Sequence, residues 1–177
     1  MSLDNRLFRD ALGQFPTGVC IITTVTPDGA RLGMTISSFN SLSLDPPLVL
    51  FSIDRRANSF AAWQQAERYA INVLNEDQEE LSNKFARPKG EKWIGQTVVG
   101  GKTGVPLLPN AVTAFECEAY SRHDGGDHEI FVGRVVELYE NLAKRGRPLV
   151  FFGRQYRRLV PGEAHTPPDE ANYLHGW

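Results

Sequence analysis

The chain has 177 residues, of which 41% are hydrophobic, and its 19 basic and 21 acidic residues give a formal net charge of -2. This length and balance predict one globular domain over residues 1–160, and the near-neutral charge argues against a nucleic-acid partner. No apolar run reaches the roughly 18 residues that cross a membrane, and the N-terminus lacks the apolar centre of a signal peptide. We therefore expect a soluble, cytoplasmic protein.

The first half of the chain is predicted to mix helices and strands. Apolar residues at helical spacing predict a helix over 7–15, which ends at Pro16 and covers a sheet. Two β-branched runs, 19–26 and 31–39, flank the turn residues 27–29 and predict a hairpin. The elements expected after them are a strand over 48–53, a helix over about 57–67, a strand over 69–74 and a helix over 76–85.

Strands dominate the predicted second half. The elements expected in order are a loop over 89–109 with a short strand near Val98, long strands over 111–120 and 129–140 joined by a turn over 124–127, and a strand over 149–159 that closes the sheet. In the first long strand, Phe115 and Cys117 alternate with Glu116 and Glu118. The tail 161–177 has little periodicity and is expected either to be disordered or to strap onto a second subunit. Many antiparallel strands with a few outer helices predict a mainly β protein with peripheral helices, closed into a barrel.

Several common functional motifs are missing. Cys20 and Cys117 lie in apolar runs without metal-ligand spacing, so we expect buried free thiols. The four histidines form no H-x-x-x-H pair, and we predict no metal site. Residues 95–103 resemble a phosphate-binding P-loop, but Gln96 stands where its first glycine belongs and no long helix is expected after Thr103. The chain has no G-x-G-x-x-G, so a nicotinamide cofactor would bind without a Rossmann unit.

Segment 33–49 is the most informative part of the sequence, because it places many hydroxyl side chains between apolar residues. Small side chains let a flat ligand lie close to the backbone, while O–H and N–H groups bond its polar rim. The alternative is an edge strand whose serines and threonines face water, and composition by itself favours that alternative. A match of the sequence to a known family pattern favours the ligand-binding interpretation instead.

Four motifs in order carry that match. They are Phe-Pro-Thr-Gly-Val at 15–19, Gly-Met-Thr at 33–35 running into Ser-Ser-Phe at 37–39, Asp-Pro-Pro at 45–47, and Gly-Asp-His-Glu-Ile-Phe-Val-Gly-Arg-Val at 126–135. The combination resembles the short-chain flavin reductases, the small components of two-component flavin monooxygenases, similar to the reductase of the 4-hydroxyphenylacetate hydroxylase system. The likeness covers about residues 5–160. It implies a split β-barrel (Greek-key) flavin-binding fold and a homodimer.

The resemblance also implies the reaction and the flavin site. The activity is an NAD(P)H-dependent transfer of a hydride to FMN or FAD, which supplies diffusible reduced flavin to an oxygenase partner. The implied flavin contacts are Met34, Thr35, Ile36, Ser37 and Ser38 along the ring, Ser52, Ile53 and Asp54 on its other side, Asn58, Ser59 and Lys84 near the ribityl phosphate, and Phe85 beside the ring. Anions favour free N–H groups and a nearby cation. Helix capping accounts for Asn58 and Ser59 nearly as well, a solvated helix face for Lys84, and a core position for Phe85.

His128 is the candidate catalytic residue. It follows the Asp-Gly-Gly-Asp turn, and the resemblance places a histidine there beside the nicotinamide. A surface histidine that completes a turn is the alternative. Because hydride transfer needs no proton at the transferring carbon, we expect His128 to hydrogen-bond the carboxamide or pyrophosphate rather than to act as a general base.

NADH is preferred over NADPH because no basic cluster obviously awaits a 2′-phosphate, although Arg154, Arg157 and Arg158 supply one if they face the groove. The region of Trp93 and the tail bearing Trp177 are candidates for a dimer interface. A competing function is a flavin-binding protein of the same fold that retains its flavin, and either reduces another acceptor or has no reductase turnover.

Overall fold

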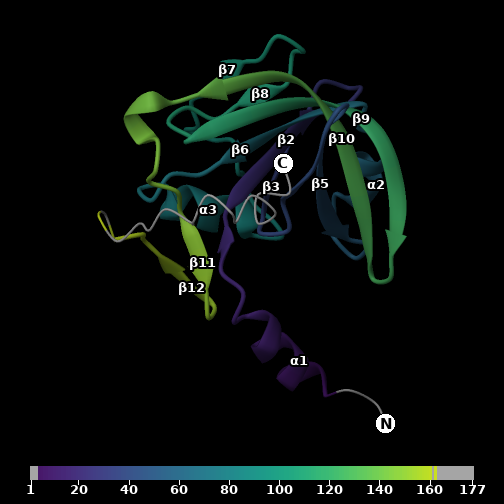
Figure 1. Cartoon of the computed structure of the whole chain (residues 1–177). Coiled ribbons are helices and arrows are strands. Elements are labelled where there is room, and N and C mark those ends of the chain that lie inside the picture. The colour runs from purple at the N-terminus through teal and green to yellow at the C-terminus, as the bar shows by residue number, and fades with distance from the viewer. Residues whose placement is uncertain (1–3, 161, 163–177) are drawn as a thin grey trace.

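The computed structural model describes residues 4–160 and residue 162, so the predicted tail lies outside the described residues except for Gly162. Strands make up most of it (Figure 1), which confirms a mainly β protein with peripheral helices. The elements in order are α1 (Asn5–Leu12), β1 (Thr17–Gly18), β2 (Cys20–Val25), β3 (Arg31–Ile36), β4 (Asn40–Leu44), β5 (Pro47–Asp54), α2 (Phe60–Gln64), β6 (Arg68–Val73), α3 (Glu79–Ala86), β7 (Val99–Gly100), β8 (Pro106–Leu107), β9 (Thr113–Gly125), β10 (His128–Glu140), the 3₁₀ turn η1 (Leu142–Lys144), β11 (Val150–Phe152) and β12 (Gln155–Arg157). Each helix in this part of the chain is too short or too polar to cross a bilayer.

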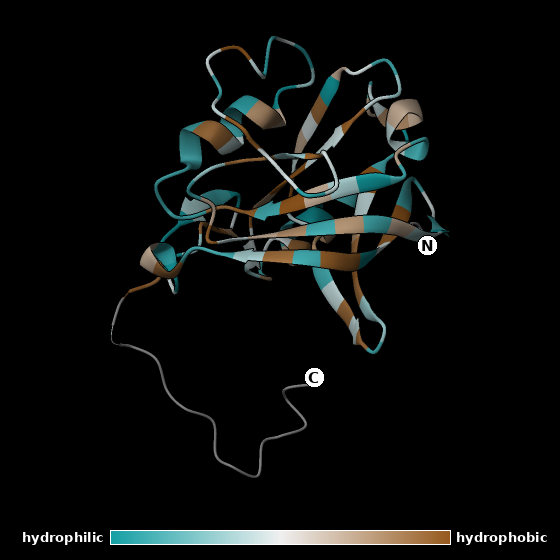
Figure 2. Cartoon of the chain, turned by 90° about the horizontal axis from the view of Figure 1, so that it is seen from above, coloured by the Kyte–Doolittle hydropathy of each residue, from teal (hydrophilic) through white to brown (hydrophobic). Residues whose placement is uncertain are grey.

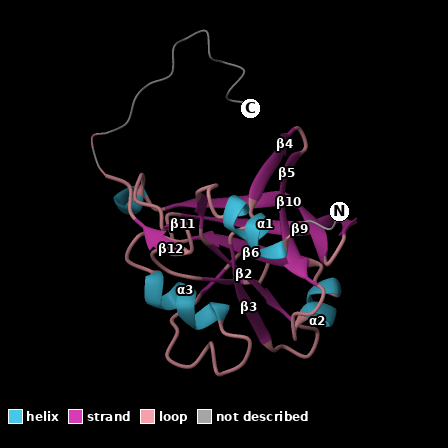
Figure 3. Ribbon diagram, turned by 90° about the horizontal axis from the view of Figure 1, so that it is seen from below, coloured by secondary structure: helices cyan, strands magenta, loops and turns pink. Residues whose placement is uncertain are grey.

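One antiparallel sheet of seven strands forms the body, in the order β3-β2-β6-β9-β10-β5-β4. The expected hairpin is confirmed, since β2 pairs with β3 and Cys20 lies opposite Ile36. β3 and β4 are the two edges, and they do not pair with each other among the described residues, so the sheet does not close into the expected barrel. β4 and its partner β5 instead project from the body (Figure 3), with most β4 side chains exposed.

Two predicted strands end differently from expectation. The run 31–39 stops at Ile36, and the unpredicted β4 follows it. The run 149–159 does not join the main sheet, but forms a separate three-stranded sheet with β1. The physical reason is the turn between β11 and β12, where Gly153 and Arg154 both have positive φ (58° and 64°) and fold the run back on itself.

The core consists of side chains on the inner faces of the strands and on two helices. Hydrophobic and hydrophilic residues alternate along the long strands (Figure 2), as expected for strands with one buried face. Helix α2 is shorter than predicted and inserts Trp63 beside Phe51 of β5. Helix α3 inserts Phe85, fully buried, into a second cluster with Val19 and Ile21. Trp63 and Phe85 thus anchor α2 and α3 to the core. This anchoring positions the turn between β5 and α2 and the loop that follows α3.

Helix α1 does not cover the sheet, contrary to expectation. Its apolar side chains are largely exposed, with Leu7 at 67% and Leu12 at 58% of full exposure, and none of its residues is buried. Figure 1 shows the helix projecting from the body. It is joined there by a hydrogen bond from the Gly153 N–H to the Gly13 carbonyl and an ion pair between Arg154 and Asp10. The described residues therefore leave this apolar helix face uncovered.

Cys20 and Cys117 are buried free thiols, as predicted, and burial raises the pKa of each to about 12. Their neighbour Glu116 is also fully buried, although its position in an alternating strand had placed it opposite the apolar residues. The loop after β7 folds over Glu116. Its carboxylate accepts hydrogen bonds from the N–H of Lys102 (2.8 Å), the N–H and hydroxyl of Thr103, and the hydroxyl of Tyr139. Glu116 thereby anchors that loop to the sheet.

We expect this anchor to make stability depend on pH. Burial opposes ionisation of Glu116, but hydrogen bonds from Thr103 and Tyr139 outweigh it and lower its pKa from the ordinary 4.5. A lowered folded-state pKa means that the stabilisation is complete above pH 4.5 and is lost as the pH falls through the folded-state value. Glu116→Gln should flatten this acid limb in denaturant titrations at several pH values. Glu116→Ala should lower the free energy of unfolding at pH 7 by at least about 1–3 kcal/mol, since buried donors lose their acceptor; an unchanged acid limb in Glu116→Gln would contradict the assignment.

Candidate functional site

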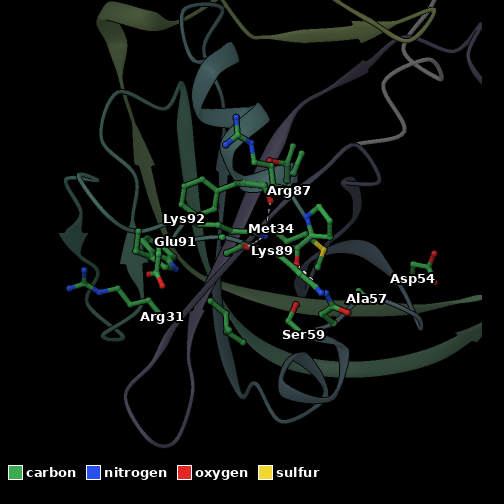
Figure 4. A pocket seen from close by; sticks show the side chains of 18 of the residues that line it. Arg31, Met34, Asp54, Ala57, Ser59, Arg87, Lys89, Glu91 and Lys92 are labelled. Carbon is green, nitrogen blue, oxygen red and sulfur yellow. Dashed lines mark hydrogen bonds between the residues drawn. The ribbon is translucent and has the colours of Figure 1, made fainter.

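The main cavity lies where β3, the turn after β5 and the end of α3 meet (Figure 4). Its volume is about 810 Å³, within the range of small-molecule sites. The residues that line it are Arg31 to Thr35 from β3, Asp54 and Arg56 to Ser59 from the turn, and Phe85 to Trp93 from the end of α3 and the loop after it. β3 is an edge strand that pairs only with β2 in the described sheet, so its outer edge at this cavity has no strand partner.

Gly33 lets α3 approach β3 closely at the cavity floor. A Cβ atom at Gly33 would lie 2.4 Å from Cε1 of Phe85 and 3.1 Å from Cζ2 of Trp93. The rings of Phe85 and Trp93 pack edge to face, with centroids 5.0 Å apart. A side chain at position 33 would therefore displace the aromatic floor.

Lys92 ties the loop after α3 to both walls. Its ammonium donates to the carbonyl oxygens of Gly33 (3.2 Å) and Phe85 (3.0 Å). Burial lowers the pKa of Lys92. These bonds use two of the three ammonium protons, so one donor remains for a ligand.

The turn after β5 forms the opposite wall. Arg56 donates from its backbone N–H and its guanidinium to the Asp54 carboxylate at 2.8 Å each, and these bonds hold the pKa of Asp54 well below its usual range. Asn58 reaches across to the Pro88 carbonyl (Nδ2 to O, 3.1 Å). Ser59 occupies the N-cap position of α2, but its side chain makes no capping bond. Helix capping therefore explains neither Asn58 nor Ser59.

Positive charge predominates around the cavity. Five cationic side chains line it against two acidic ones, and the cations are Arg31, Arg56, Arg87, Lys89 and Lys92. Of these, only Arg56 has a carboxylate partner among the described residues. This cluster was not predicted from the sequence, because its members come from three separate segments. The basic run between 87 and 92, in a loop that follows a predicted helix, was the available signal.

The hydroxyl-rich segment is only partly free to bind a ligand. The Thr35 hydroxyl donates to the Ser82 carbonyl (2.7 Å), which ties β3 to α3. The Ser38 hydroxyl both donates to the Ser52 carbonyl and accepts from the Ser52 N–H, at 3.0 Å each. Ser37 is exposed. The edge-strand alternative applies to the exposed serine of β4, Ser41.

The predicted site residues divide into three groups. Those that line the cavity are Met34, Thr35, Asp54, Asn58, Ser59 and Phe85. Those that continue along the same strands without lining it are Ile36, Ser37, Ser38, Ser52 and Ile53, of which Ile36 and Ile53 are core residues. Lys84 stands apart, because its ammonium donates to the Ile94 carbonyl (2.6 Å) and lines a different cavity. The structure thus brings together about half of the predicted set.

His128 is the first residue of β10 and does not line the cavity, but its strand partner Asp54 does. The imidazole is 41% exposed, and its Nδ1 lies 2.6 Å from Oδ1 of Asp127. Arg55 fixes the hairpin tip, donating to the Gly126 carbonyl (3.2 Å) and to carboxylates of Asp124 and Glu129. The bonds from Arg55 therefore stabilise the turn that carries His128 beside the cavity.

The three arginines considered for a 2′-phosphate do not reach the cavity. Arg154 pairs with Asp10 of α1, Arg158 lies 3.7 Å from Asp77, and Arg157 donates to Gln155. The cations available to a phosphate in the main cavity are instead the five that line it, from Arg31 to Lys92.

Comparison with known proteins gives a consistent result. A family model described as a flavin reductase like domain matches residues 12–160. The chain is 41% identical over 156 residues to the FMN reductase (NADH) SmoA of Agrobacterium fabrum, which covers 88% of this chain and 87% of that protein. It is 38% identical over 167 residues to HsaB, the reductase subunit of a flavin-dependent monooxygenase from Rhodococcus jostii, with coverage of 94% and 84%.

A solved structure shows the same fold. The crystal structure of nitrilotriacetate monooxygenase component B from Mycobacterium thermoresistibile matches with a TM-score of 0.89 and 36% identity, over 93% of this chain and 92% of that one. The motifs, the fold and the extent of these matches agree, and the chain belongs to the family of flavin reductase like domain proteins.

Proposed function

We propose that the protein is an NAD(P)H-dependent flavin reductase, which reduces FMN or FAD and releases the reduced flavin to a partner monooxygenase. The observation that carries the proposal is the main cavity, where an edge strand without a second strand partner meets a cationic rim. Such a site matches a ligand with a flat polar-edged ring and a phosphate. The relatives named as flavin reductases and monooxygenase components support the same activity.

The residues present fit a flavin. Gly33 leaves room against the aromatic floor, and the outer edge of β3 offers N–H and C=O groups to the polar rim of a ring. Ser59 has a hydroxyl without a capping partner, and Arg87 and Lys89 have no carboxylate partner among the described residues. We assign the phosphate to these groups rather than to Lys84.

The chain's own residues contribute placement rather than chemistry. A bound flavin supplies the hydride acceptor, as cofactors generally carry such chemistry. The walls at β3 and the 54–59 turn restrict the orientation of the ring, and holding two reactants in one geometry is a large source of rate enhancement. His128 holds the nicotinamide by a hydrogen bond at the hairpin tip.

We expect His128→Ala to raise the KM for NADH by about tenfold while leaving the flavin Kd within about twofold, because one hydrogen bond to the donor is lost. Steady-state kinetics and flavin fluorescence titration measure the two quantities. His123→Ala is the matched control, since His123 lies exposed on the same hairpin, where its imidazole bonds the Ser121 hydroxyl. Equal effects of the two substitutions on KM would refute the role of His128.

We further propose a homodimer in which α1 of one copy packs on the other copy. Four apolar side chains of this segment are at least 49% exposed, namely Leu7, Phe8, Leu12 and Phe15. A helix of eight residues is marginal in water without packing, so this face needs a cover. Trp93 is a poorer candidate, because its ring packs on Phe85 within its own chain. Trp177 lies outside the described residues.

Phe8→Asp should shift the protein from dimer to monomer in analytical ultracentrifugation. A buried unpaired carboxylate in the interface costs several kcal/mol. Arg9→Asp, on another face of the same helix, should leave the dimer intact. A dimer that survives Phe8→Asp at micromolar concentration would place the interface elsewhere.

The activity is tested by adding NADH and FMN or FAD to the purified protein and following nicotinamide absorbance. Oxidation that requires added flavin is the expected result, and no oxidation with either flavin and either nicotinamide would refute the assignment. Flavin that stays bound through gel filtration would favour the alternative, an enzyme that retains its flavin for another acceptor. A split-barrel classification, the single domain over 1–160 and a cytoplasmic location remain predictions that accompany this proposal.

A further inference from the structure

The wall of the main cavity contains an oxidisable sulfur atom. The chain has two methionines and two cysteines, and Met1 lies outside the described residues. Met34 is half-buried and lines the main cavity, where Figure 4 draws its side chain among those of the other lining residues. Peroxides oxidise a thioether sulfur to a sulfoxide, which is polar. Among the described residues, Met34 thus carries the sulfur that a solute in the main cavity can reach.

The two cysteines are shielded from such oxidants. Cys20 and Cys117 are 1% and 0% exposed, and burial raises the pKa of each thiol to about 12. Because the thiolate is the form that reacts with peroxide, thiols of this kind are poor targets. Neither cysteine lines the main cavity. Oxidation of the described sulfur atoms should therefore begin at Met34.

Strand β3 places Met34 between the core and the cavity. Successive side chains of a strand point to opposite faces, so Met34 lies on the other face of β3 from Gly33 and Thr35, which approach α3. Met34 packs against the main core cluster, as does Ala57, which also lines the cavity. Its strand partner Ile22 is fully buried, which opposes a shift of β3. A polar group at the Met34 sulfur would therefore lie against apolar surface and beside a ligand in the cavity.

The activity proposed above supplies the oxidant. Reduced flavin that has been released and that no oxygenase takes up reacts with dioxygen in solution, which returns the flavin to its oxidised form and yields hydrogen peroxide. The sulfur lone pair of Met34 attacks one peroxide oxygen, so that an S–O bond forms and the O–O bond breaks. The proton of the transferred oxygen passes to the departing hydroxide. The products are methionine sulfoxide and water, with the sulfur oxidised by two electrons and the peroxide reduced.

We propose that Met34 is an oxidation site whose sulfoxide weakens flavin binding, and that it limits the oxidation of NADH when no partner uses the reduced flavin. This inference rests on the function proposed above. Because the sulfoxide oxygen must give up water when a ring covers it, the cost falls on the bound state, and we expect the Kd for FMN to rise by about tenfold. Methionine sulfoxide reductases reverse the modification, so the effect is reversible.

The test treats the full chain with millimolar hydrogen peroxide in the dark, with a methionine-containing reference peptide in the same solution. Mass spectrometry should show added oxygen on the peptide that contains Met34, and fluorescence titration should show FMN binding weakened by about tenfold. Saturating FMN should slow the oxidation of Met34 but not that of the reference peptide. Methionine sulfoxide reductases for both epimers should then restore the Kd to within about twofold of the untreated value.

Two variants separate the oxidation of Met34 from other damage. Met34→Leu has nearly the same volume but no sulfur, so its own Kd for FMN should be the same before and after peroxide treatment. Met34→Gln carries a polar group without any peroxide, and it should bind FMN about tenfold more weakly than Met34→Leu. Thermal unfolding checks that each variant is folded, and the reductase treatment of the wild type tests the proposal without any substitution.

Several results would overturn the inference. They are a Met34 that stays unoxidised while the reference peptide reacts, oxidation that FMN does not slow, oxidation that leaves the Kd for FMN unchanged, a loss of FMN binding that the reductases do not reverse, and an equal loss in Met34→Leu. Each of these can occur in a protein that reduces flavin normally before treatment. A failure of the proposed function differs from them, because untreated wild-type protein would then show no flavin-dependent oxidation of NADH.

Discussion

Gly33→Ala should weaken flavin binding and lower the free energy of unfolding by about 1–3 kcal/mol, the usual cost of overpacking a well-packed region. The added Cβ would lie 2.4 Å from the ring of Phe85, a distance at which the ring must move. Because Phe85 is fully buried and packs on Trp93, its displacement disturbs the cavity floor. Flavin fluorescence titration and denaturant unfolding measure the two effects.

Gly18→Ala is the matched control, since Gly18 is also a strand glycine but has no atom within 4 Å of its ideal Cβ position. We expect its stability to stay within about 1 kcal/mol of the wild type. The double variant Gly33→Ala/Phe85→Leu should lose less stability than the sum of the two single losses, because the smaller Leu side chain removes the clash with the added Cβ. A Gly33→Ala protein that binds flavin as tightly as the Gly18→Ala protein would contradict the placement of the ligand against β3.

Gly133→Ala should destabilise the centre of the sheet by about 1–3 kcal/mol or more. Its Cβ would lie 2.5 Å from the hydroxyl of Tyr69 and 2.9 Å from Cβ of Cys117, both in the core. Neither neighbour can withdraw, because Tyr69 and Cys117 are fully buried. The midpoint of urea unfolding reports the loss.

Tyr69→Phe provides the companion measurement. The Tyr69 hydroxyl is buried without a hydrogen-bond partner among the described residues, and burial raises its pKa above the ordinary value, so it stays neutral. Because an unpartnered buried hydroxyl is costly, Tyr69→Phe should be neutral or stabilising by up to about 1 kcal/mol. In a double-mutant cycle it should relieve part of the Gly133→Ala defect, with the contact to Cys117 remaining. Strict additivity would show that the Tyr69 contact is not the cause.

The hairpins and the buried strands could be predicted because their residues are strongly patterned. Strand β2 is almost wholly apolar or β-branched, and the Pro-Asp-Gly turn fixes its partner β3. Strand β4 could not be predicted in the same way, since Asn40–Leu44 is mostly exposed and follows no clean alternation. The exposure of α1 could not be predicted either. An apolar stripe on a helix has the same sequence pattern whether the surface that covers it belongs to the same chain or to another.

The site was partly predictable for a similar reason. The motif around Met34 lies along one wall of the main cavity, but the residues of α3 that face this cavity were harder to predict. Residues one apart on a helix do not share a face, so Phe85 faces the main cavity while Lys84 lines a different one. The cations Arg87 and Lys89 carry no periodic signal, because they lie in a loop whose course only the folded chain reveals.

The most direct test of the account is a crystal structure of the protein soaked with FMN. We predict ring density along the outer edge of β3 against Gly33 and Met34, with the phosphate near Ser59 and Arg87. Density for the flavin at another place, or a cavity closed by the protein's own side chains, would contradict the assignment of this cavity as the flavin site.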